Sequence, residues 1–135
     1  MRNEKVNYFA IILVVILCQV VGFLWYSPFF FGAQWMALVG KSAEDLKAGG
    51  GLPFVYAIMG SFLMIFILAK VIYATHSNSV GQGVAMGFIL WLGFIFPTVC
   101  INNIFAGHSF ELAFINSGHF LIDMLLAGGI LAVFR

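Results

Sequence analysis

The chain of 135 residues is 63% hydrophobic and 8% charged, whereas a soluble domain carries roughly 25% charged residues. With a mean hydropathy of +1.08, this composition excludes a soluble domain and predicts an integral membrane protein whose main partner is the lipid bilayer. Six Lys and Arg residues against five Asp and Glu residues give a net charge of +1. The chain therefore has no basic face for nucleic acid, and we expect no nucleic-acid partner.

The first apolar run, residues 6–25, follows Arg2 and Lys5 and has the charge order of a secretory signal. Its length of about twenty residues exceeds the roughly 7 to 15 residues of a signal's apolar region, and no Ala-x-Ala cleavage site follows it. We therefore expect residues 6–25 to form a retained first transmembrane helix.

The sequence Trp25-Tyr26-Ser27-Pro28 predicts where this helix ends. Pro28 lacks the backbone donor that a continuing helix needs, and it biases the residue before it away from helical conformations. Trp and Tyr concentrate at the level of the lipid headgroups, because part of each ring is apolar and part hydrogen-bonds to water. We expect helix 1 to end here at the membrane interface, with Trp25 and Pro28 as parts of an interface anchor or a lid.

Residues 29–47 form the only sizeable connection in the chain. Residues 29–39 are too apolar for a free loop and too short to span, so we expect them to lie in the interface across the mouth of the bundle, with Trp35 as an anchor. Ser42 and Asp45 have the spacing of a capping box, which predicts a short surface helix before the Gly49-Gly50-Gly51 hinge.

Three further runs, residues 52–74, 80–103 and 112–134, are long enough to cross a hydrocarbon core of about 30 Å. The short connections between them make sequential helices antiparallel neighbours. The sequence thus predicts an all-α fold, a single transmembrane domain over residues 1–135 with four transmembrane helices in an up-down bundle and a short interfacial helix after the first.

The Lys and Arg residues predict the orientation of this bundle. Four basic residues share one side of the membrane and two share the other, which favours both termini in the cytoplasm of a multi-pass inner-membrane protein. The four are Arg2, Lys5, Lys70 and Arg135, and the two are Lys41 and Lys47. We expect Lys70, near the end of its helix, to extend its ammonium group to the interface.

Glycines in the third span, above all Gly83 and Gly87 at a G-x-x-x-G spacing, predict a close approach of another helix. That helix belongs either to the same bundle or to a second copy of the chain. Fifteen glycines in a chain with only four spans favour a homo-oligomer, because small membrane proteins often complete their pockets between subunits.

The fourth span holds Asn116, His119 and Asp123 on one helical face, at i, i+3 and i+7. A carboxylate near the middle of a span costs about 2.5 to 3.5 kcal/mol on insertion scales, so Asp123 must face protein or water, be paired, or be protonated. His119, one turn away, is its nearest ionisable neighbour. We expect these two residues to form a proton-linked pair, charged or neutral according to the balance of hydrogen bonding and burial.

Polar residues gather in the outer halves of the spans and are almost absent from the inner halves. Besides His119 and Asp123, the set that we expect to line a polar cavity open to the outside, roofed by residues 29–39, is Gln19, Tyr26, Tyr56, Thr98, Asn102 and Asn116. The alternative is that these side chains only hydrogen-bond between helices as packing contacts.

Metal binding is a weaker interpretation of the same residues. His108 and Glu111 lie just outside His119 and Asp123, but two His and two acids without an H-E-x-x-H pattern do not define a site, so we expect no metal and no cofactor. Cys18 and Cys100 fall in apolar runs, where we expect them to behave as small apolar residues.

Four sequence elements carry a resemblance that covers essentially the whole chain. They are Asn7-Tyr8, Gly22-x-x-Trp25-Tyr26-Ser27-Pro28, Phe31-Gly32-x-x-Trp35 and Ile115-Asn116-Ser117-Gly118-His119. Together they resemble the bacterial family called domain of unknown function 1761. The resemblance implies a small four-helix inner-membrane protein and no established activity, and it does not extend to Asp123, whose importance depends on its depth.

These observations favour a protein that binds or passes a small solute through the polar cavity, with Asp123 and His119 as its proton-linked groups. The first alternative is a membrane-embedded enzyme acting on a lipid-like substrate, with His119 as general base oriented by Asp123. The second is an accessory or scaffold subunit without a ligand, for which a fully packed outer half is expected.

Overall fold

The structure is a computed structural model that describes residues 5–134. Its elements, in order, are α1 (Tyr8–Trp25), α2 (Gly32–Val39), α3 (Ala43–Ala48), α4 (Leu52–Ala74), α5 (Val80–Leu90), the π-helical turn η1 (Trp91–Ile95), α6 (Phe96–Phe105) and α7 (Phe110–Val133). No strand occurs in the described part of the chain. Four helices are long and apolar enough to cross a membrane, Tyr8–Trp25, Leu52–Ala74, Val80–Phe105 and Phe110–Val133, which confirms the predicted all-helical membrane fold.

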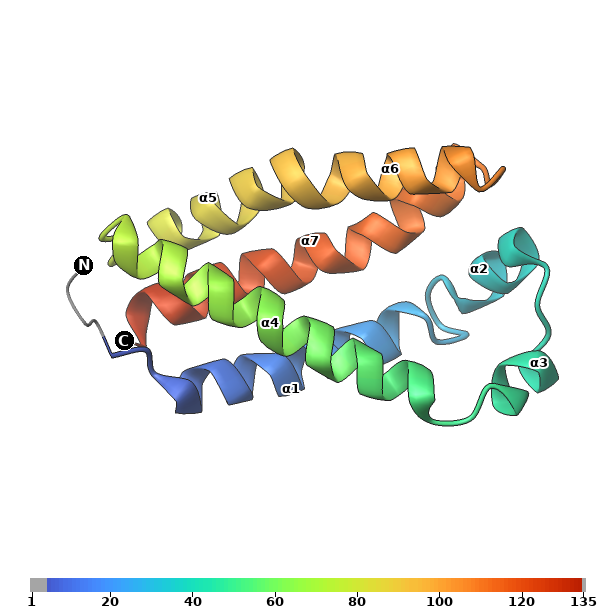
Figure 1. Cartoon of the computed structure of the whole chain (residues 1–135), viewed down its shortest axis with the longest axis horizontal. Helices are drawn as coiled ribbons and strands as arrows, with labels where there is room; N and C mark the ends of the chain where they lie inside the picture. The colour runs from blue at the N-terminus through green and yellow to red at the C-terminus, as the bar shows by residue number, and fades with distance from the viewer. Residues whose placement is uncertain (1–4, 135) are drawn as a thin grey trace.

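The four long helices run alternately in opposite directions, and α2 and α3 cover one end of the bundle (Figure 1). The beginning of α1, the end of α7 and the turn between α4 and α5 lie together at the other end. Arg2 and Arg135, two of the residues behind the predicted orientation, lie outside the described residues.

Two helix boundaries differ from the predicted ones because polar side chains cap the helices. The Asn7 side chain accepts a hydrogen bond from the backbone N–H of Ala10 (3.1 Å), so α1 begins at Tyr8 rather than at residue 6. Ser109 caps α7 in the same way, through the N–H of Leu112 (3.3 Å), and this helix begins before residue 112. The predicted capping box of Ser42 and Asp45 is present at the start of α3.

The third span contains a π-helical turn that the sequence analysis did not predict. Pro97 cannot donate to the carbonyl group four residues before it, and its ring collides with that carbonyl in a regular α-helix. The turn accommodates Pro97 with a longer step, in which the N–H of Phe96 bonds to the carbonyl oxygen of Trp91. The helix therefore continues from Val80 to Phe105, whereas α1 ends at Trp25, before Pro28.

α5 packs against α7 through glycines. A Cβ atom at Gly83 would overlap the carbonyl oxygen of Gly128, and one at Gly87 would overlap the carbonyl oxygen of Met124. Of the two interpretations of the G-x-x-x-G spacing, packing within one bundle is therefore the one observed.

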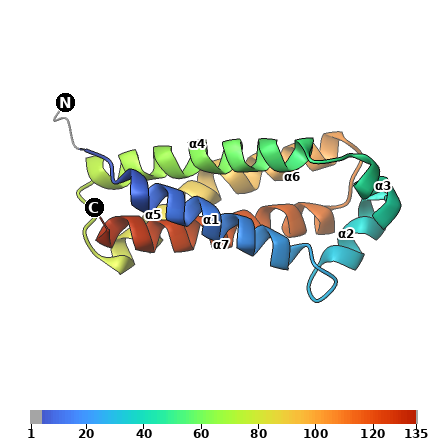
Figure 2. The same cartoon turned by 90° about the horizontal axis from the view of Figure 1, so that it is seen from below.

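The apolar core lies toward the end of the bundle where α1 begins. The most completely buried large side chains there include Ile11, Val14, Ile65, Leu68 and Ile72, contributed by α1 and α4. Neither helix has a buried residue in the half nearer α2 and α3, beyond Cys18 in α1 and before Ile65 in α4. Figure 2 shows the two helices diverging toward that end, which leaves room for the cavities described next.

Candidate functional site

A tight corner after α1 places the first site residues. The helix ends at Trp25, as the position of Pro28 predicts, and the Ser27 hydroxyl donates to the carbonyl oxygen of Leu24 (2.7 Å). The chain then turns back so closely that a Cβ atom at Gly32 would lie 2.8 Å from the carbonyl oxygen of Ser27. Only glycine fits there, and α2 starts directly beneath the end of α1.

Trp25 attaches this corner to α7. Its indole N–H donates to the carbonyl oxygen of Ile115 (2.9 Å). Its ring lies against Gly118, where a Cβ atom would come within 2.7 Å of the ring atom Cζ2. Trp25 is therefore half-buried between helices, with its polar edge bonded to protein.

Four side chains from three segments meet in one hydrogen-bonded network. The Tyr26 hydroxyl lies 3.1 Å from Asn116 Oδ1 and 3.1 Å from His119 Nδ1. The indole N–H of Trp35, in α2, donates to the same Asn116 oxygen (3.1 Å). The Tyr26 and Trp35 rings also meet edge to face, with centroids 5.8 Å apart. The first three residues were expected at the cavity, and the network joins them to the expected lid.

The direction of the hydrogen bond between Tyr26 and His119 depends on whether His119 Nδ1 carries a proton. A phenolic group has one proton and also accepts hydrogen bonds. It either donates to Asn116 and accepts a hydrogen bond from a protonated Nδ1 of His119, or donates to an unprotonated Nδ1. A change in the protonation of His119 Nδ1 therefore changes whether Tyr26 donates to Asn116, the residue that also accepts the hydrogen bond from Trp35 of α2.

A cavity of about 540 Å³ lies between α1, α4 and α7 on one side of this network. Its lining residues are Cys18, Gln19, Gly22, Phe23, Tyr26, Ser27, Pro28, Phe54, Ala57, Gly60, Ser61, His119, Phe120 and Asp123. Gln19 Nε2 donates to the Ser61 hydroxyl (3.0 Å), which joins α1 to α4 across the cavity wall. The lining is mainly apolar, with a few polar groups among aromatic rings, as in most small-molecule sites.

Asp123 is the most unusual group in this cavity. Its side chain is 2% exposed, and its Oδ1 atom has no hydrogen-bond partner. The carboxyl group has one side-chain partner, the thiol of Cys18 on α1. A weak thiol donor leaves most of the hydrogen-bonding capacity of a carboxyl group unused, so the carboxyl group of Asp123 is buried at the cavity wall without a strong partner.

Asp123 and His119 are not bonded to each other. Among residues 5–134, the partners of His119 are the Tyr26 hydroxyl and the backbone of Asn116, and the side-chain partner of Asp123 is Cys18. Both side chains line the same cavity, so any communication between them passes through its contents or along α7.

A second cavity of about 580 Å³ lies on the other side of the network, beneath α2 and α3. Trp35, Asn103, His108 and Asn116 line it, and Tyr26 lines both cavities. The Nδ2 atom of Asn103 is buried without a partner. The Tyr26 network thus separates an inner cavity that contains Asp123 from an outer one that is covered by α2. In the described part of the chain, no three His, Cys, Asp or Glu side chains gather as metal ligands would.

Comparison with known proteins assigns the chain to a family. A family model described as "Protein of unknown function (DUF1761)" matches residues 9–132, nearly the whole transmembrane region. The chain belongs to this family. No curated protein and no solved structure matches it. The family carries no assigned activity, so the function of this member has to be argued from its site.

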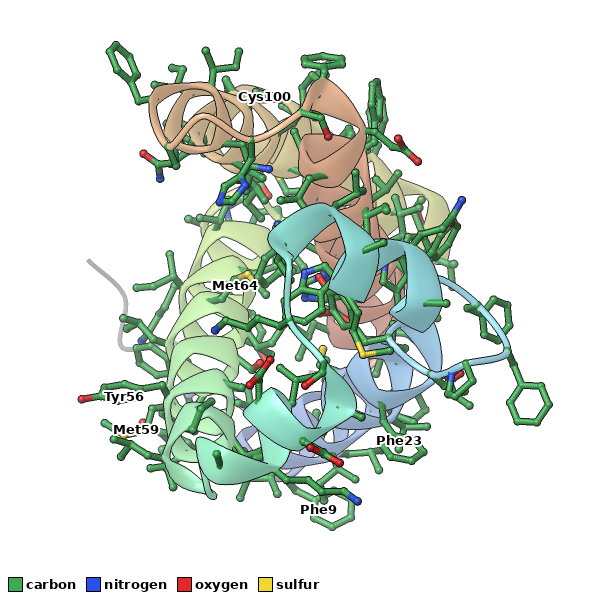
Figure 3. All side chains as sticks on the ribbon, turned by 90° about the vertical axis from the view of Figure 1, so that its right-hand side faces the viewer. Phe9, Phe23, Tyr56, Met59, Met64 and Cys100 are labelled. Carbon is green, nitrogen blue, oxygen red and sulfur yellow. The ribbon has the colours of Figure 1, made fainter. Side chains whose placement is uncertain are left out.

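Three residues expected at the polar cavity of this family member lie away from both cavities. Tyr56 is 67% exposed and projects away from the bundle, as Figure 3 shows from the α2–α3 end. Thr98 is exposed and turns back to bond the carbonyl oxygen of Phe94 (2.5 Å). Asn102 is also exposed. The position of each residue along its span did not fix which way its helix face points.

Two residues outside the predicted set belong to the site, Cys18, which was expected to behave as a small apolar residue, and Asn103, the neighbour of the predicted Asn102. Cys18 is the hydrogen-bond partner of Asp123, and Asn103 presents an unpaired amide to the outer cavity. Cys18, Gly22 and Tyr26 stand at i, i+4 and i+8, one face of α1, and this spacing was a usable indication that Cys18 faces the site. Trp91 is a buried packing residue, and its indole N–H donates to the carbonyl oxygen of Ser117 (2.9 Å).

Proposed function

We propose that this protein binds, or passes, a small solute in the cavity between α1, α4 and α7, with Asp123 and His119 as proton-linked groups. The observation that carries the proposal is the unpartnered Oδ1 of Asp123, on a side chain that is 2% exposed and lines that cavity. An unpaired acid inside a membrane protein is costly, and such residues usually mark pathways for ions, protons or substrates.

The Tyr26 network supports a route to Asp123 from the α2–α3 end. Tyr26 lines both cavities, and its hydroxyl is held by Asn116 and His119. Trp35 ties α2 to the same Asn116 oxygen. We infer that α2 is a lid, that Tyr26 is the partition behind it, and that protonation of His119 Nδ1 switches the Tyr26 hydroxyl from donating to His119 to donating to Asn116.

The orientation and the assembly of the protein are also part of this proposal. Lys5 and Lys70 lie toward the end where α1 begins, and Lys41 and Lys47 lie toward the other, so we infer an inner membrane, cytoplasmic termini and a cavity open outward. Homo-oligomerisation remains a prediction from size, because Gly83 and Gly87 are used within the bundle and no longer argue for it.

An enzyme acting on a lipid-like substrate is the second candidate, favoured by the apolar rim of the inner cavity. Phe23 and Phe54 line this cavity and are 78% and 70% exposed, so lipid chains can approach it from the side. The geometry does not support the catalytic roles expected for this candidate, His119 as general base and Asp123 as the residue that orients it, because His119 Nδ1 is paired with Tyr26 and not with Asp123. Two cavities at the α2–α3 end count against the third candidate, a scaffold with a fully packed outer half.

Proton movement tests the proposal. Proteoliposomes with an internal pH-sensitive dye would receive an external pH step, alone and with three probes of different charge: benzyltrimethylammonium, phenylacetate and benzyl alcohol. We expect at least one probe to change the rate of internal pH change with the wild-type protein, and Asp123→Asn to abolish that effect. Glu111→Gln is the matched control, because it removes the same charge from an exposed position in the first turn of α7. If all three proteins respond alike, Asp123 is a structural residue and the proposal is wrong.

A further inference from the structure

We infer that the solute of the inner cavity is a small monovalent organic cation, an amine or a quaternary ammonium with an apolar body, whose nitrogen lies against Asp123. This inference rests on the proposed function, since it names the chemical class of solute for the same site.

The charge of the cavity favours a cation over an anion. Its titratable lining groups are Cys18 and Tyr26 from the α1 side and His119 and Asp123 from α7, and among the described residues no Lys or Arg lines it. The α4 residues of the lining are not titratable, and α5 and η1, which pack against the other side of α7, contain no titratable residue. No Lys or Arg compensates the charge of an ionised Asp123, so with His119 neutral the potential in the cavity is negative.

The number and kind of donors favour an organic cation over a metal ion. A single carboxylate balances a single positive charge, whereas calcium takes six to eight oxygen ligands. No cluster of three His, Cys, Asp or Glu side chains exists in the described residues. One hydrogen-bonding oxygen beside an apolar wall fits a protonated amine or an alkylated nitrogen.

Aromatic rings supply the rest of the surroundings that such a cation requires. Tyr26, Phe120, Phe23 and Phe54 line the cavity together with Asp123. The faces of aromatic rings attract ammonium groups, and cages of such rings are a general means of holding quaternary nitrogen. The volume of about 540 Å³ falls within the range of roughly 300 to 1,000 Å³ that is usual for small-molecule sites.

The rim of the cavity offers an amphipathic cation a way in. Phe23 and Phe54 are largely exposed, on the sides of α1 and α4 that face lipid. Gly22 and Gly60 lie on the same two helices, and a Cβ atom at either would meet nothing within 4 Å. A cation with an apolar body collects at the headgroup level and could move sideways between these helices, whereas a fully hydrated ion would have to pass α2.

Cation and proton are then alternatives at one carboxyl group. When the cation binds to protonated Asp123, the O–H bond breaks, the carboxylate pairs with the ammonium group, and one proton is released to the solvent. Lowering the pH reverses this exchange and expels the cation. Occupation of the cavity by a cation therefore couples to proton movement without a second acid.

Calorimetric titration of the protein in nanodiscs of zwitterionic lipid, with benzyltrimethylammonium as the probe, tests the inference. We expect the tightest binding at alkaline pH, where Asp123 is ionised and no proton is released. Once the pH is low enough to protonate the carboxyl group, the Kd should rise roughly tenfold for each further unit of decrease in pH, and each bound cation should release one proton. Loss of a buried charge partner generally weakens binding by about 30-fold or more, which is the effect expected of Asp123→Asn. Glu111→Gln should leave the Kd unchanged.

Two more variants keep the test decisive if Asp123→Asn folds poorly. Gly60→Leu adds bulk to the cavity at a position with open space around it, so it should fold and lose the cation. His119→Gln should keep the release of one proton per cation, because that proton comes from Asp123, and proton release that disappears without His119 but survives without Asp123 would overturn the inference.

The other two probes separate this inference from the proposed function. If phenylacetate or benzyl alcohol binds and benzyltrimethylammonium does not, the inference is wrong while the proposed solute site stands. If none of the three binds at any pH, the inference is wrong, and the proteoliposome experiment alone decides whether the cavity is a solute site. A cation that binds equally well to wild type and Asp123→Asn also overturns it.

Discussion

Replacement of Trp35 by Phe is expected to open the α2 lid and expose Cys18. The change keeps an aromatic ring beside Tyr26 but removes the N–H that donates to Asn116 Oδ1 at 3.1 Å. A hydrogen bond of this kind contributes about 0.5 to 1.5 kcal/mol. With a value of about 1 kcal/mol, the population of molecules with an open lid rises about fivefold, since 1.4 kcal/mol corresponds to a factor of ten.

Cys18 provides the assay, because it is 3% exposed and lines the inner cavity behind Tyr26. In a protein whose other thiol is removed by Cys100→Ala, a charged, membrane-impermeant maleimide can reach Cys18 only when the path is open. When the lid closes faster than the reagent reacts, the labelling rate is proportional to the open population. We expect Trp35→Phe to raise that rate about fivefold.

Trp25→Phe is the matched control for this experiment. It also removes one indole hydrogen bond to α7, at 2.9 Å to Ile115, but this bond does not involve α2. We expect it to lower the unfolding temperature and leave the labelling rate of Cys18 unchanged. If Trp35→Phe behaves in the same way as Trp25→Phe, α2 is only an anchor and the lid does not exist.

Three further predictions concern the rest of the fold. Gly83→Ala should lower the free energy of unfolding by about 1 to 3 kcal/mol, because the added methyl group overlaps a carbonyl oxygen of α7. Gly81→Ala, in open space, should leave it unchanged. Equal effects of the two variants would refute the packing argument. Trp91→Phe should cost about 1 kcal/mol through its lost hydrogen bond of 2.9 Å, and an unchanged unfolding midpoint would contradict this. Hydrogen bonds from Ser42 lower the pKa of Asp45, so α3 should be most stable above the ordinary pKa of an aspartate. As the pH falls through the lowered pKa, the amides of α3 should lose their protection from hydrogen exchange. Asp45→Asn should remove that pH dependence.

The sequence allowed the fold to be predicted because length, hydropathy and caps act locally. The four spans, the break at Pro28 and the capping box of Ser42 each depend on residues close together in the chain. Pro97 shows the limit of such reasoning. α1 ends just before Pro28, whereas the third span continues past Pro97 through the π-helical turn η1, and the rule that proline ends a helix does not distinguish the two cases.

The site was predicted less completely because side-chain direction depends on helix rotation. The extra residue of a π-helical turn shifts every later side chain by about 100° around the helix. Beyond η1, Thr98 and Asn102 are exposed, and Asn103 is the residue with a buried polar atom. On α7, where no such turn intervenes, Asn116, His119 and Asp123 were predicted on one face and all three line cavities.

The hydrogen bonds of the Tyr26 network have a consequence for how the protein is made. They join residues 81 to 93 positions apart, Trp35 to Asn116 and Tyr26 to both Asn116 and His119. At a synthesis rate of about 5 to 20 residues per second, the nascent first helix waits about 5 to 20 seconds in the bilayer before the last one emerges. During that interval the hydroxyl and indole groups have only water and lipid headgroups as partners. The network therefore forms only after α7 is inserted, and a chain that lacks α7 leaves the Tyr26 hydroxyl and the Trp35 indole N–H without these partners.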